Sequence, residues 1–284
     1  MGYRHIEVVP IAGALGAEIT GVDLAAPLPE EVFAEVHQAF LAHAVVFFRD
    51  QSLAPAQQIA FARRFGEPEV HPIVEGSHEH PELVRVWKPA GESASFGTGW
   101  HTDNSFFPCP SLGSVLHGIV IPPYGGDTIF ASTERAYDAL SEGLRRMLDG
   151  LVAVHSASRA YDPANVGEAK YRGEAPMRYR WSESIREEVL HPVVRTHPET
   201  GRKSIYVNPM FTLRIRGLAE AESGALLGFL FAHCAKPDWS CRFRWTPGAV
   251  AIWDNRCAWH YALDDYREFE RVMHRVTIAG DRPF

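Results

Sequence analysis

The sequence predicts a mainly β protein with helical additions, in the form of a β-sandwich or jelly roll. Short runs rich in β-branched and aromatic residues are spread over the whole chain, and helical patterns interrupt them without regular alternation. No internal repeat, low-complexity tract or linker divides the 284 residues. We therefore expect a single domain over residues 1–284.

The N-terminal part combines both kinds of pattern. Apolar residues recur at helical spacing after Pro29 and two acidic residues, which are typical of a helix start. A continuous apolar run then indicates a buried strand. The elements expected here are short β-like stretches within residues 6–24, a helix over about 29–41, a strand over Val45–Phe48 and a helix over Pro55–Phe65.

Two long polar segments are expected to be active-site loops, because segments of this length with little regular structure commonly bind ligands. They cover residues 71–99, with one short strand over 83–87, and residues 156–187. Ser132 and Thr133 are candidate caps for a helix running to about Leu148. The remaining expected elements are strands over 114–121, 128–130, 193–196, 204–208, 242–245, 250–253 and 271–278, and a helix over 219–234.

Charge and composition exclude several classes of function. With 28 Lys and Arg against 35 Asp and Glu, the net charge of −7 argues against nucleic acid as a partner. No apolar run approaches the roughly 20 residues of a membrane span, so no membrane partner is expected. The four scattered cysteines form no Cys-x-x-Cys pair and favour a reducing, cytoplasmic location.

The segment Trp100-His101-Thr102-Asp103 carries the strongest chemical signal. If it forms a strand, His101 and Asp103 project to the same face and can coordinate one metal ion. His260 follows a strongly β-like run and would be the third ligand. Two histidines and a carboxylate are the ligand set of non-haem Fe(II) oxygenases, although the same set also holds the zinc of some hydrolases.

Two arginines point to bound anions. Arg271 and Arg275 have an even separation, so they share one face of the expected strand over 271–278. Two guanidinium groups facing a closed β interior would be costly without anionic partners, and a carboxylate matches the donors of arginine bidentately. Thr128 could add a hydroxyl donor. The alternative is an exposed edge strand paired with neighbouring acidic residues, Asp264, Asp265 or Glu270.

These residues, together with several other separated segments, resemble the Fe(II)/2-oxoglutarate-dependent dioxygenases of the taurine dioxygenase (TauD/TfdA) type. The further segments are Gly16–Leu24, Val45–Arg49, Tyr124–Thr128, His191–Pro198, Trp253–Arg256 and Met273–Arg275. The resemblance covers nearly the whole chain. It implies a double-stranded β-helix, or jelly roll, that uses Fe(II), 2-oxoglutarate and O2, and a homo-oligomer, either a dimer or a tetramer.

The resemblance also implies the site residues. Fe(II) would be bound by His101, Asp103 and His260, and the far carboxylate of 2-oxoglutarate by Thr128 and Arg271. His71 and Arg275 would face the anionic group of the substrate. These seven residues match the corresponding motif positions of the family.

The implied substrate is a small organic anion, most simply a sulfonate such as taurine, which would yield an aldehyde and sulfite with succinate and CO2. Val74 and Gly97 stand where taurine-cleaving members carry a tyrosine and an asparagine, so an aryloxyalkanoate or an alkyl sulfate is the alternative substrate. Three aromatic residues, Phe106, Phe107 and Tyr206, are candidates for an apolar pocket or for core packing. A non-catalytic metal-binding jelly roll is the alternative of a different class.

Overall fold

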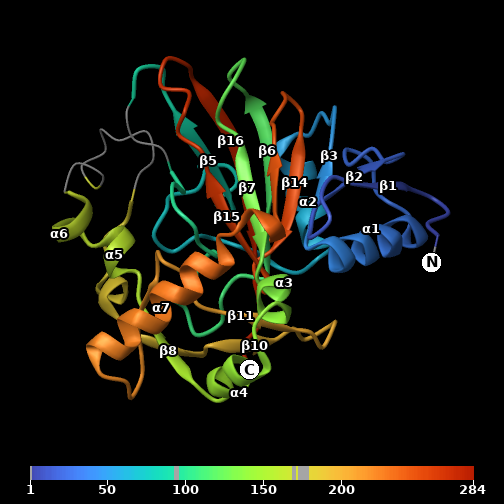
Figure 1. Cartoon of the computed structure of the whole chain (residues 1–284). Coiled ribbons are helices and arrows are strands. Elements are labelled where there is room, and N and C mark those ends of the chain that lie inside the picture. The colour runs from blue at the N-terminus through green and yellow to red at the C-terminus, as the bar shows by residue number, and fades with distance from the viewer. Residues whose placement is uncertain (1, 93–95, 168–170, 172–178) are drawn as a thin grey trace.

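The computed structural model describes residues 2–92, 96–167, 171 and 179–284, and its largest feature is an eight-stranded sheet. Figure 1 shows the strands of this sheet beside one another. Their order is β1, β2, β3, β14, β6, β16 and β4, and β5 also pairs with β16. The strands span Glu7–Pro10 (β1), Ala17–Thr20 (β2), Val45–Phe48 (β3), Pro68–Glu69 (β4), Leu83–Lys88 (β5), Gly113–Val120 (β6), Val250–Asp254 (β14) and Arg271–Ile278 (β16).

Three smaller sheets complete the β structure. The one that matters most for the site has the order β13, β7, β15, and the others are β12-β8-β9 and β10-β11. Their strands are Thr128–Ser132 (β7), Val152–His155 (β8), Val189–Pro192 (β9), Val194–Thr196 (β10), Lys203–Ile205 (β11), Thr212–Ile215 (β12), Ser240–Phe243 (β13) and Ala258–Ala262 (β15).

The large sheet packs face to face on the β13-β7-β15 sheet. Phe47 on β3 stacks on Phe243 of β13 with ring centroids 3.9 Å apart, and it meets the edge of Phe130 of β7 at 5.6 Å. Trp253 of β14 contacts Phe130 from the large sheet at 5.8 Å. These aromatic contacts form the interior between the sheets, and the predicted jelly roll is confirmed.

Helices cover the outer faces of both sheets. On the large sheet, α1 (Glu30–His43) and α2 (Pro55–Arg63) pack against the side chains of β3 and β14 that point away from the sandwich interior. On the β13-β7-β15 sheet, α3 (Thr133–Asp138) and α7 (Glu220–Cys234) pack against the outward side chains of β7 and β15. Because β3 and β14 are buried on both faces, they read as continuous apolar runs rather than alternating patterns.

The helix predicted from Ser132 or Thr133 to Leu148 is wrong, because the chain forms two helices there. Ser132 caps α3 as expected, with its hydroxyl accepting from the Arg135 amide, and Thr133 is the first residue of that helix. A second cap, Ser141, accepts from the Leu144 amide and starts α4 (Glu142–Leu148) in a new direction. The Ser141 hydroxyl therefore starts a second helix within the range predicted for one.

Other differences concern short strands. The sequence patterns did not identify β8, β9, β12 and β15, whose lengths of four or five residues leave too few positions to establish a period. The predicted strands over 204–208 and 242–245 are shifted or shortened to β11 and β13. The helices over 29–41, 55–65 and 219–234 are confirmed within a few residues.

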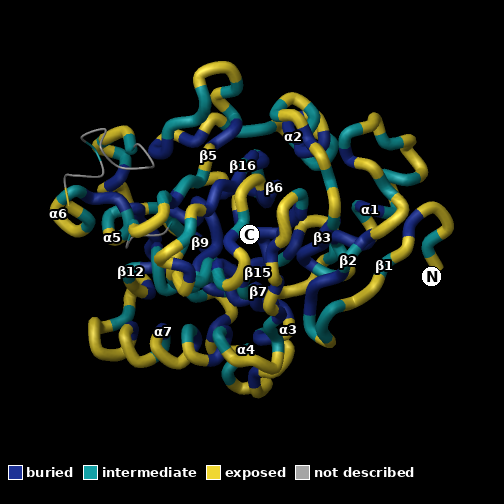
Figure 2. The backbone as a smooth tube through the Cα atoms, turned by 90° about the horizontal axis from the view of Figure 1, so that it is seen from above, coloured by how far each residue is buried: buried dark blue, intermediate teal, exposed yellow. Residues whose placement is uncertain are grey.

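The two expected active-site loops lie partly outside the described residues, at 93–95, 168–170 and 172–178. Within the second segment the described part contains α5 (Ser158–Tyr161), α6 (Pro163–Val166) and the 3-10 helix η2 (Glu183–Arg186), and a further 3-10 helix, η3, spans Pro237–Trp239. Figure 2 shows buried backbone at the centre around β7, β15, β6 and β16 and exposed backbone around the rim. In the described part of the chain, the helices are too short or too polar to cross a lipid bilayer.

Candidate active site

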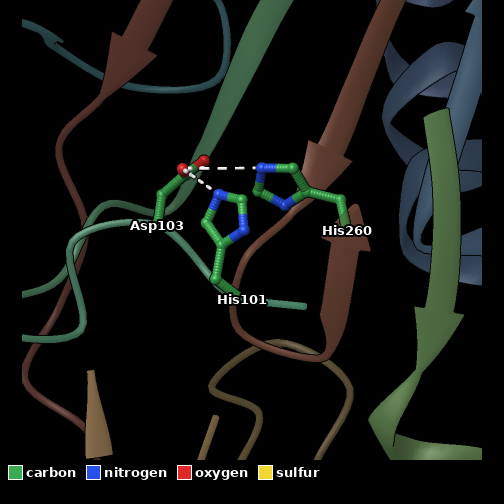
Figure 3. A group of neighbouring side chains, drawn as sticks. All are labelled: His101, Asp103 and His260. Atoms are coloured by element: carbon green, nitrogen blue, oxygen red, sulfur yellow. Dashed lines mark ion pairs between the residues drawn. The ribbon is translucent and has the colours of Figure 1, made fainter. Parts of the chain in front are cut away.

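His101, Asp103 and His260 lie together in the interior of the fold (Figure 3). The Asp103 Oδ1 atom is 3.7 Å from His101 Nε2 and 3.6 Å from His260 Nε2. His260 belongs to β15, and reciprocal backbone hydrogen bonds of 3.1 and 2.8 Å pair it with His101. All three side chains are buried, and their ligand atoms lie close enough to hold one metal ion.

The prediction that His101 and Asp103 share a strand is wrong. His101 makes an isolated bridge, and Asp103 lies in the turn that follows it. Asn255 holds this turn, because its side-chain oxygen accepts from the Asp103 amide at 3.2 Å and its backbone carbonyl accepts from the Thr102 hydroxyl at 2.7 Å. The two ligands thus converge through a turn anchored by a distant residue.

Hydrogen bonds prepare the ligand atoms for a metal. His101 Nδ1 lies 2.9 Å from the Gly99 carbonyl and therefore carries the proton, which leaves the lone pair on Nε2 facing Asp103. The second oxygen of Asp103, Oδ2, is 2.7 Å from Arg275 Nη2 and accepts from the Trp253 indole at 3.3 Å. One carboxylate oxygen is thus held by the protein while the other faces the histidines.

Electrostatics favour the protonation states that bind metal. Burial lowers the pKa of His101 and holds that of His260 well below its usual value. Burial alone would raise the pKa of Asp103, but the nearby charges of Arg275 and the two histidines outweigh it and lower that pKa. Neutral imidazoles beside an ionised carboxylate are the forms that coordinate a divalent cation.

A second group of side chains is suited to a carboxylate. A narrow cavity of about 40 Å³ joins Thr128 and Arg271 to His101 and His260. The Trp245 indole donates to the Thr128 hydroxyl at 2.9 Å, so the hydroxyl proton remains available. Arg271 is buried on β16, and its Nε and Nη2 atoms have no hydrogen-bond partner. Buried donors without an acceptor are costly, which fits an absent anion such as a carboxylate of 2-oxoglutarate.

The largest hollow beside the metal ligands has a volume of about 300 Å³. Its lining is polar and apolar in about equal measure. The polar residues include His71, Thr98, Asn104, Arg159 and Arg275, and the apolar or aromatic ones are Phe96, Ala160, Tyr161, Tyr179, Pro209, Met210 and Phe211. The cavity is thus suited to an anion that carries an apolar group.

Comparison with known proteins decides the family. The family model described as "Taurine catabolism dioxygenase TauD, TfdA family" matches residues 7–277. The chain belongs to this family. It is therefore a 2-oxoglutarate-dependent non-haem iron dioxygenase, which uses Fe(II), 2-oxoglutarate and O2 and acts on a small molecule.

Relatives of the TauD/TfdA family align with almost the full chain. An alkylsulfatase of Acinetobacter baylyi is 36% identical, covering 98% of this chain and 86% of its own. An alpha-ketoglutarate-dependent sulfate ester dioxygenase of Pseudomonas putida is 38% identical, covering 98% and 91%. Alpha-ketoglutarate is another name for 2-oxoglutarate.

Solved structures agree with this assignment. A taurine dioxygenase from Burkholderia xenovorans is 37% identical with a TM-score of 0.84, covering 99% of this chain and 91% of its own. The structure of AAD-2 in complex with Mn(II) and N-oxalylglycine is 31% identical with a TM-score of 0.79 and covers 98% of both chains. The fold is thus shared with both of these solved structures.

The residues predicted for the dioxygenase site fall into the two cavities. His71 and Arg275 line the larger one together with His101 and Asp103, and Thr128 and Arg271 line the smaller one together with His101 and His260. Arg275 also lines the smaller cavity, so it lies between the two. The alternative of an exposed edge strand is wrong, because β16 lies inside the sheet between β6 on one side and β4 and β5 on the other.

Of the two roles expected for Phe106, Phe107 and Tyr206, core packing is the one observed. Phe106 and Tyr206 pack in the interior, and the Phe107 ring contacts that of Phe106 at a tilt of 58°, with ring centroids 4.4 Å apart. The cavity is lined instead by the aromatic residues already named. Sequence reasoning also missed Trp245 and gave Asn255 no role, because both act by contacts with residues far along the chain, where no local spacing signals them.

A second cluster with metal-ligating groups contains His197, Asp254 and Cys257. His197 Nε2 lies 3.0 Å from Asp254, and its Nδ1 accepts from the amides of Glu199 and Thr200. Arg256 binds both oxygens of Asp254, at 2.8 and 2.7 Å. The polar atoms of the histidine and the aspartate are therefore already paired, and the cluster stabilises the turn between β14 and β15.

Proposed function

We propose that His101, Asp103 and His260 hold Fe(II) in this dioxygenase. The observation that carries the proposal is the convergence of the three ligand atoms, with the His101 lone pair and one Asp103 oxygen turned inward. Fe(II) bound there would, together with 2-oxoglutarate and O2, oxidise an unactivated C–H bond of the substrate, and succinate and CO2 would be the coproducts. The protein supplies orientation: Trp253 and Arg275 fix the carboxylate, and Gly99 fixes the first imidazole.

We further propose that Arg271 and Thr128 bind the distal carboxylate of 2-oxoglutarate. The unpartnered donors of Arg271 support this, and so does the Thr128 hydroxyl, which accepts from Trp245 and so keeps its own proton to donate. The narrow cavity leads from these groups to the two histidines. The dicarboxylate is thereby held with its 2-oxo acid end toward the metal ligands.

The substrate is an organic anion whose charged head lies against Arg275 and His71. Asp103 and Ser114 hold the Arg275 guanidinium, at 2.7 and 3.0 Å from Nη2, so its orientation is set before a ligand binds. Among the described residues that line the cavity, Asp103 is the single carboxylate, and it faces the metal site. The taurine ammonium would therefore lack an acidic partner, whereas an apolar chain would pack on Phe211, Met210 and their neighbours.

We therefore favour a sulfate ester or sulfonate with an apolar chain over taurine itself. Hydroxylation of the carbon that bears the sulfate gives an unstable intermediate, which releases sulfate and leaves an aldehyde. The 36% and 38% identity to an alkylsulfatase and a sulfate ester dioxygenase supports this choice. An aryloxyalkanoate remains the alternative, supported by a (S)-phenoxypropionate/alpha-ketoglutarate-dioxygenase of Sphingobium herbicidovorans that is 33% identical.

The substrate proposal predicts a clear order of activity. With Fe(II) and 2-oxoglutarate present, we expect kcat/KM for hexyl sulfate to exceed that for taurine by at least about tenfold, because only the alkyl chain matches the apolar wall. Oxygen uptake is measured for hexyl sulfate, taurine and 2-phenoxypropionate, with sulfate, sulfite and phenol assayed in parallel. A larger kcat/KM for taurine would contradict the proposal. Turnover without 2-oxoglutarate would indicate a zinc hydrolase. Absence of oxygen uptake with every substrate would indicate a non-catalytic protein.

His71 is expected to act in its neutral form. Its Nδ1 accepts from the amides of Ile73 and Val74 at 3.2 and 2.9 Å, so the proton sits on Nε2. Burial, assisted by the charge of Arg275, lowers the pKa of His71 to about 4. The neutral form is therefore stable above that pH, and protonation at lower pH would break both amide contacts.

The substrate KM should consequently show no titration of His71 between about pH 6 and 8. We expect His71→Ala to raise this KM by a similar factor at every pH in that range, because one neutral donor is lost. Steady-state kinetics at several pH values measures the effect. A wild-type KM that rises near the ordinary histidine pKa, and no longer does so in His71→Ala, would show that His71 binds as a cation.

We also propose that residues 1–284 work as one domain, with segments 71–99 and 156–187 forming part of the active site. Support comes from the larger cavity, to which His71, Phe96 and Tyr161 contribute from the two segments. A homo-oligomer and a cytoplasmic location are further proposals. The four cysteines are unpaired, which is consistent with a reducing compartment.

A further inference from the structure

Two buried cations, Lys88 and Arg271, lie side by side next to the smaller cavity, which Arg271 lines. Lys88 ends β5, directly opposite Arg271 on β16, and the two residues are register partners. Partners in antiparallel strands project to the same face of the sheet. The exposed fractions are 4% for Lys88 and 5% for Arg271, so both charges are withdrawn from water.

The Tyr266 ring contacts both cations. Lys88 Nζ lies 4.5 Å from the ring centroid, and the Arg271 guanidinium carbon lies 5.8 Å from it. The other contacts of Lys88 Nζ are the carbonyls of Tyr266 and Arg267, at 3.4 and 3.3 Å. The ammonium group is thus held by a ring face and two carbonyl oxygens.

No carboxylate in the described part of the chain pairs with either cation. The nearby acids have other partners: Asp127 binds Arg242 at 2.6 Å, and Asp265 accepts from the Gly126 amide at 2.7 Å. Two buried nitrogen atoms of Arg271, Nε and Nη2, have no acceptor, although the Asp127 charge acts on the guanidinium from further away. Two buried positive charges without a paired carboxylate are unfavourable in the free protein, and a bound anion would relieve both.

We propose that Lys88 is a positioning residue for the distal carboxylate of 2-oxoglutarate and acts through Tyr266 and Arg271. The proposal rests on the assignment of Arg271 as the carboxylate anchor. The ammonium fixes the ring against which Arg271 lies, and its charge raises the positive potential at the carboxylate. Lys88 does not itself line the cavity, so its influence on the ligand is indirect.

The packing around Tyr266 supports a fixed arrangement. A Cβ atom added at Gly126 would lie 3.1 Å from the Tyr266 ring and 3.3 Å from Arg271 Cδ. Glycine therefore allows the β6-β7 turn to press directly on both side chains. The ring, the guanidinium and this turn form one packed unit, which can transmit the position of Lys88 to Arg271.

The test compares two ligands and two variants. The Mn(II)-loaded enzyme is titrated calorimetrically with 2-oxoglutarate and with 2-oxopentanoate, which lacks the distal carboxylate. We expect Lys88→Met to raise the Kd for 2-oxoglutarate about tenfold and to change the Kd for 2-oxopentanoate by less than about twofold. Lys236→Met is the matched control, because Lys236 lies over the Trp239 ring at 5.6 Å but is exposed and far from the site. It should bind both ligands like the wild type.

A second measurement distinguishes this role from a purely structural one. Removing an uncompensated buried charge should leave the thermal stability of the ligand-free Lys88→Met protein equal to or above that of the wild type, while the stabilisation by 2-oxoglutarate decreases. Equal weakening of both ligands, or unchanged 2-oxoglutarate affinity, would overturn the inference. A wild-type protein that binds no 2-oxoglutarate with Mn(II) would instead overturn the proposed function.

Discussion

Replacing His101 with alanine is expected to lower substrate-dependent succinate formation by more than about 100-fold. Loss of a residue that only hydrogen-bonds a metal ligand commonly lowers metal affinity or activity about 10- to 100-fold, so loss of a ligand itself should have a larger effect. His101 contributes its Nε2 lone pair beside Asp103, at 3.7 Å from Oδ1, and no other described side chain replaces it there. Succinate is measured by chromatography, and bound metal by mass spectrometry after desalting.

His5→Ala is a suitable control for this experiment, because His5 is exposed near the N-terminus, outside the segments assigned to the active site, and is no part of the metal site. It should retain wild-type metal content and turnover. Asp103→Ala should lose activity as severely as His101→Ala, and it should also destabilise the fold, since Arg275 would keep its buried charge without the carboxylate that now balances it. Full turnover in either ligand variant would mean that the metal binds elsewhere.

Replacing Arg271 with alanine is expected to raise the KM for 2-oxoglutarate by roughly 30-fold to several thousand-fold. Truncating one partner of a buried, hydrogen-bonded charge pair typically costs about 2–5 kcal/mol, and each 1.4 kcal/mol corresponds to a factor of ten. The KM for the organic substrate should change far less, because Arg275 and His71 remain. Steady-state oxygen uptake with each ligand varied in turn separates the two effects.

Arg214→Ala serves as the control for Arg271→Ala, since Arg214 forms an exposed pair with Glu188 outside both cavities. Its expected effect on either KM is within about twofold. An unchanged 2-oxoglutarate KM would place the carboxylate anchor on another residue.

Much of the chemistry was predictable from the sequence because it depends on residue type and on period. The two-residue spacing of strands put Arg271 and Arg275 on one face, and the smaller cavity, which both residues line, confirms that expectation. The apolar run Val45–Phe48 could be identified as a buried strand from its composition, since both of its faces are covered. The resemblance to the TauD/TfdA family selected the His101, Asp103 and His260 set from among 14 histidines and 35 acids.

What the sequence determined is therefore the kind of ligand that each site can take, because side-chain chemistry and strand period are local properties. Only the tertiary structure decided which atoms face which. The orientation of Asp103 depends on Asn255, 152 residues away, and on Arg275 and Trp253 from two other strands. The buried pair Lys88 and Arg271 likewise arises from the pairing of β5 with β16. Contacts between distant segments carry no local spacing, so only their folded positions reveal them.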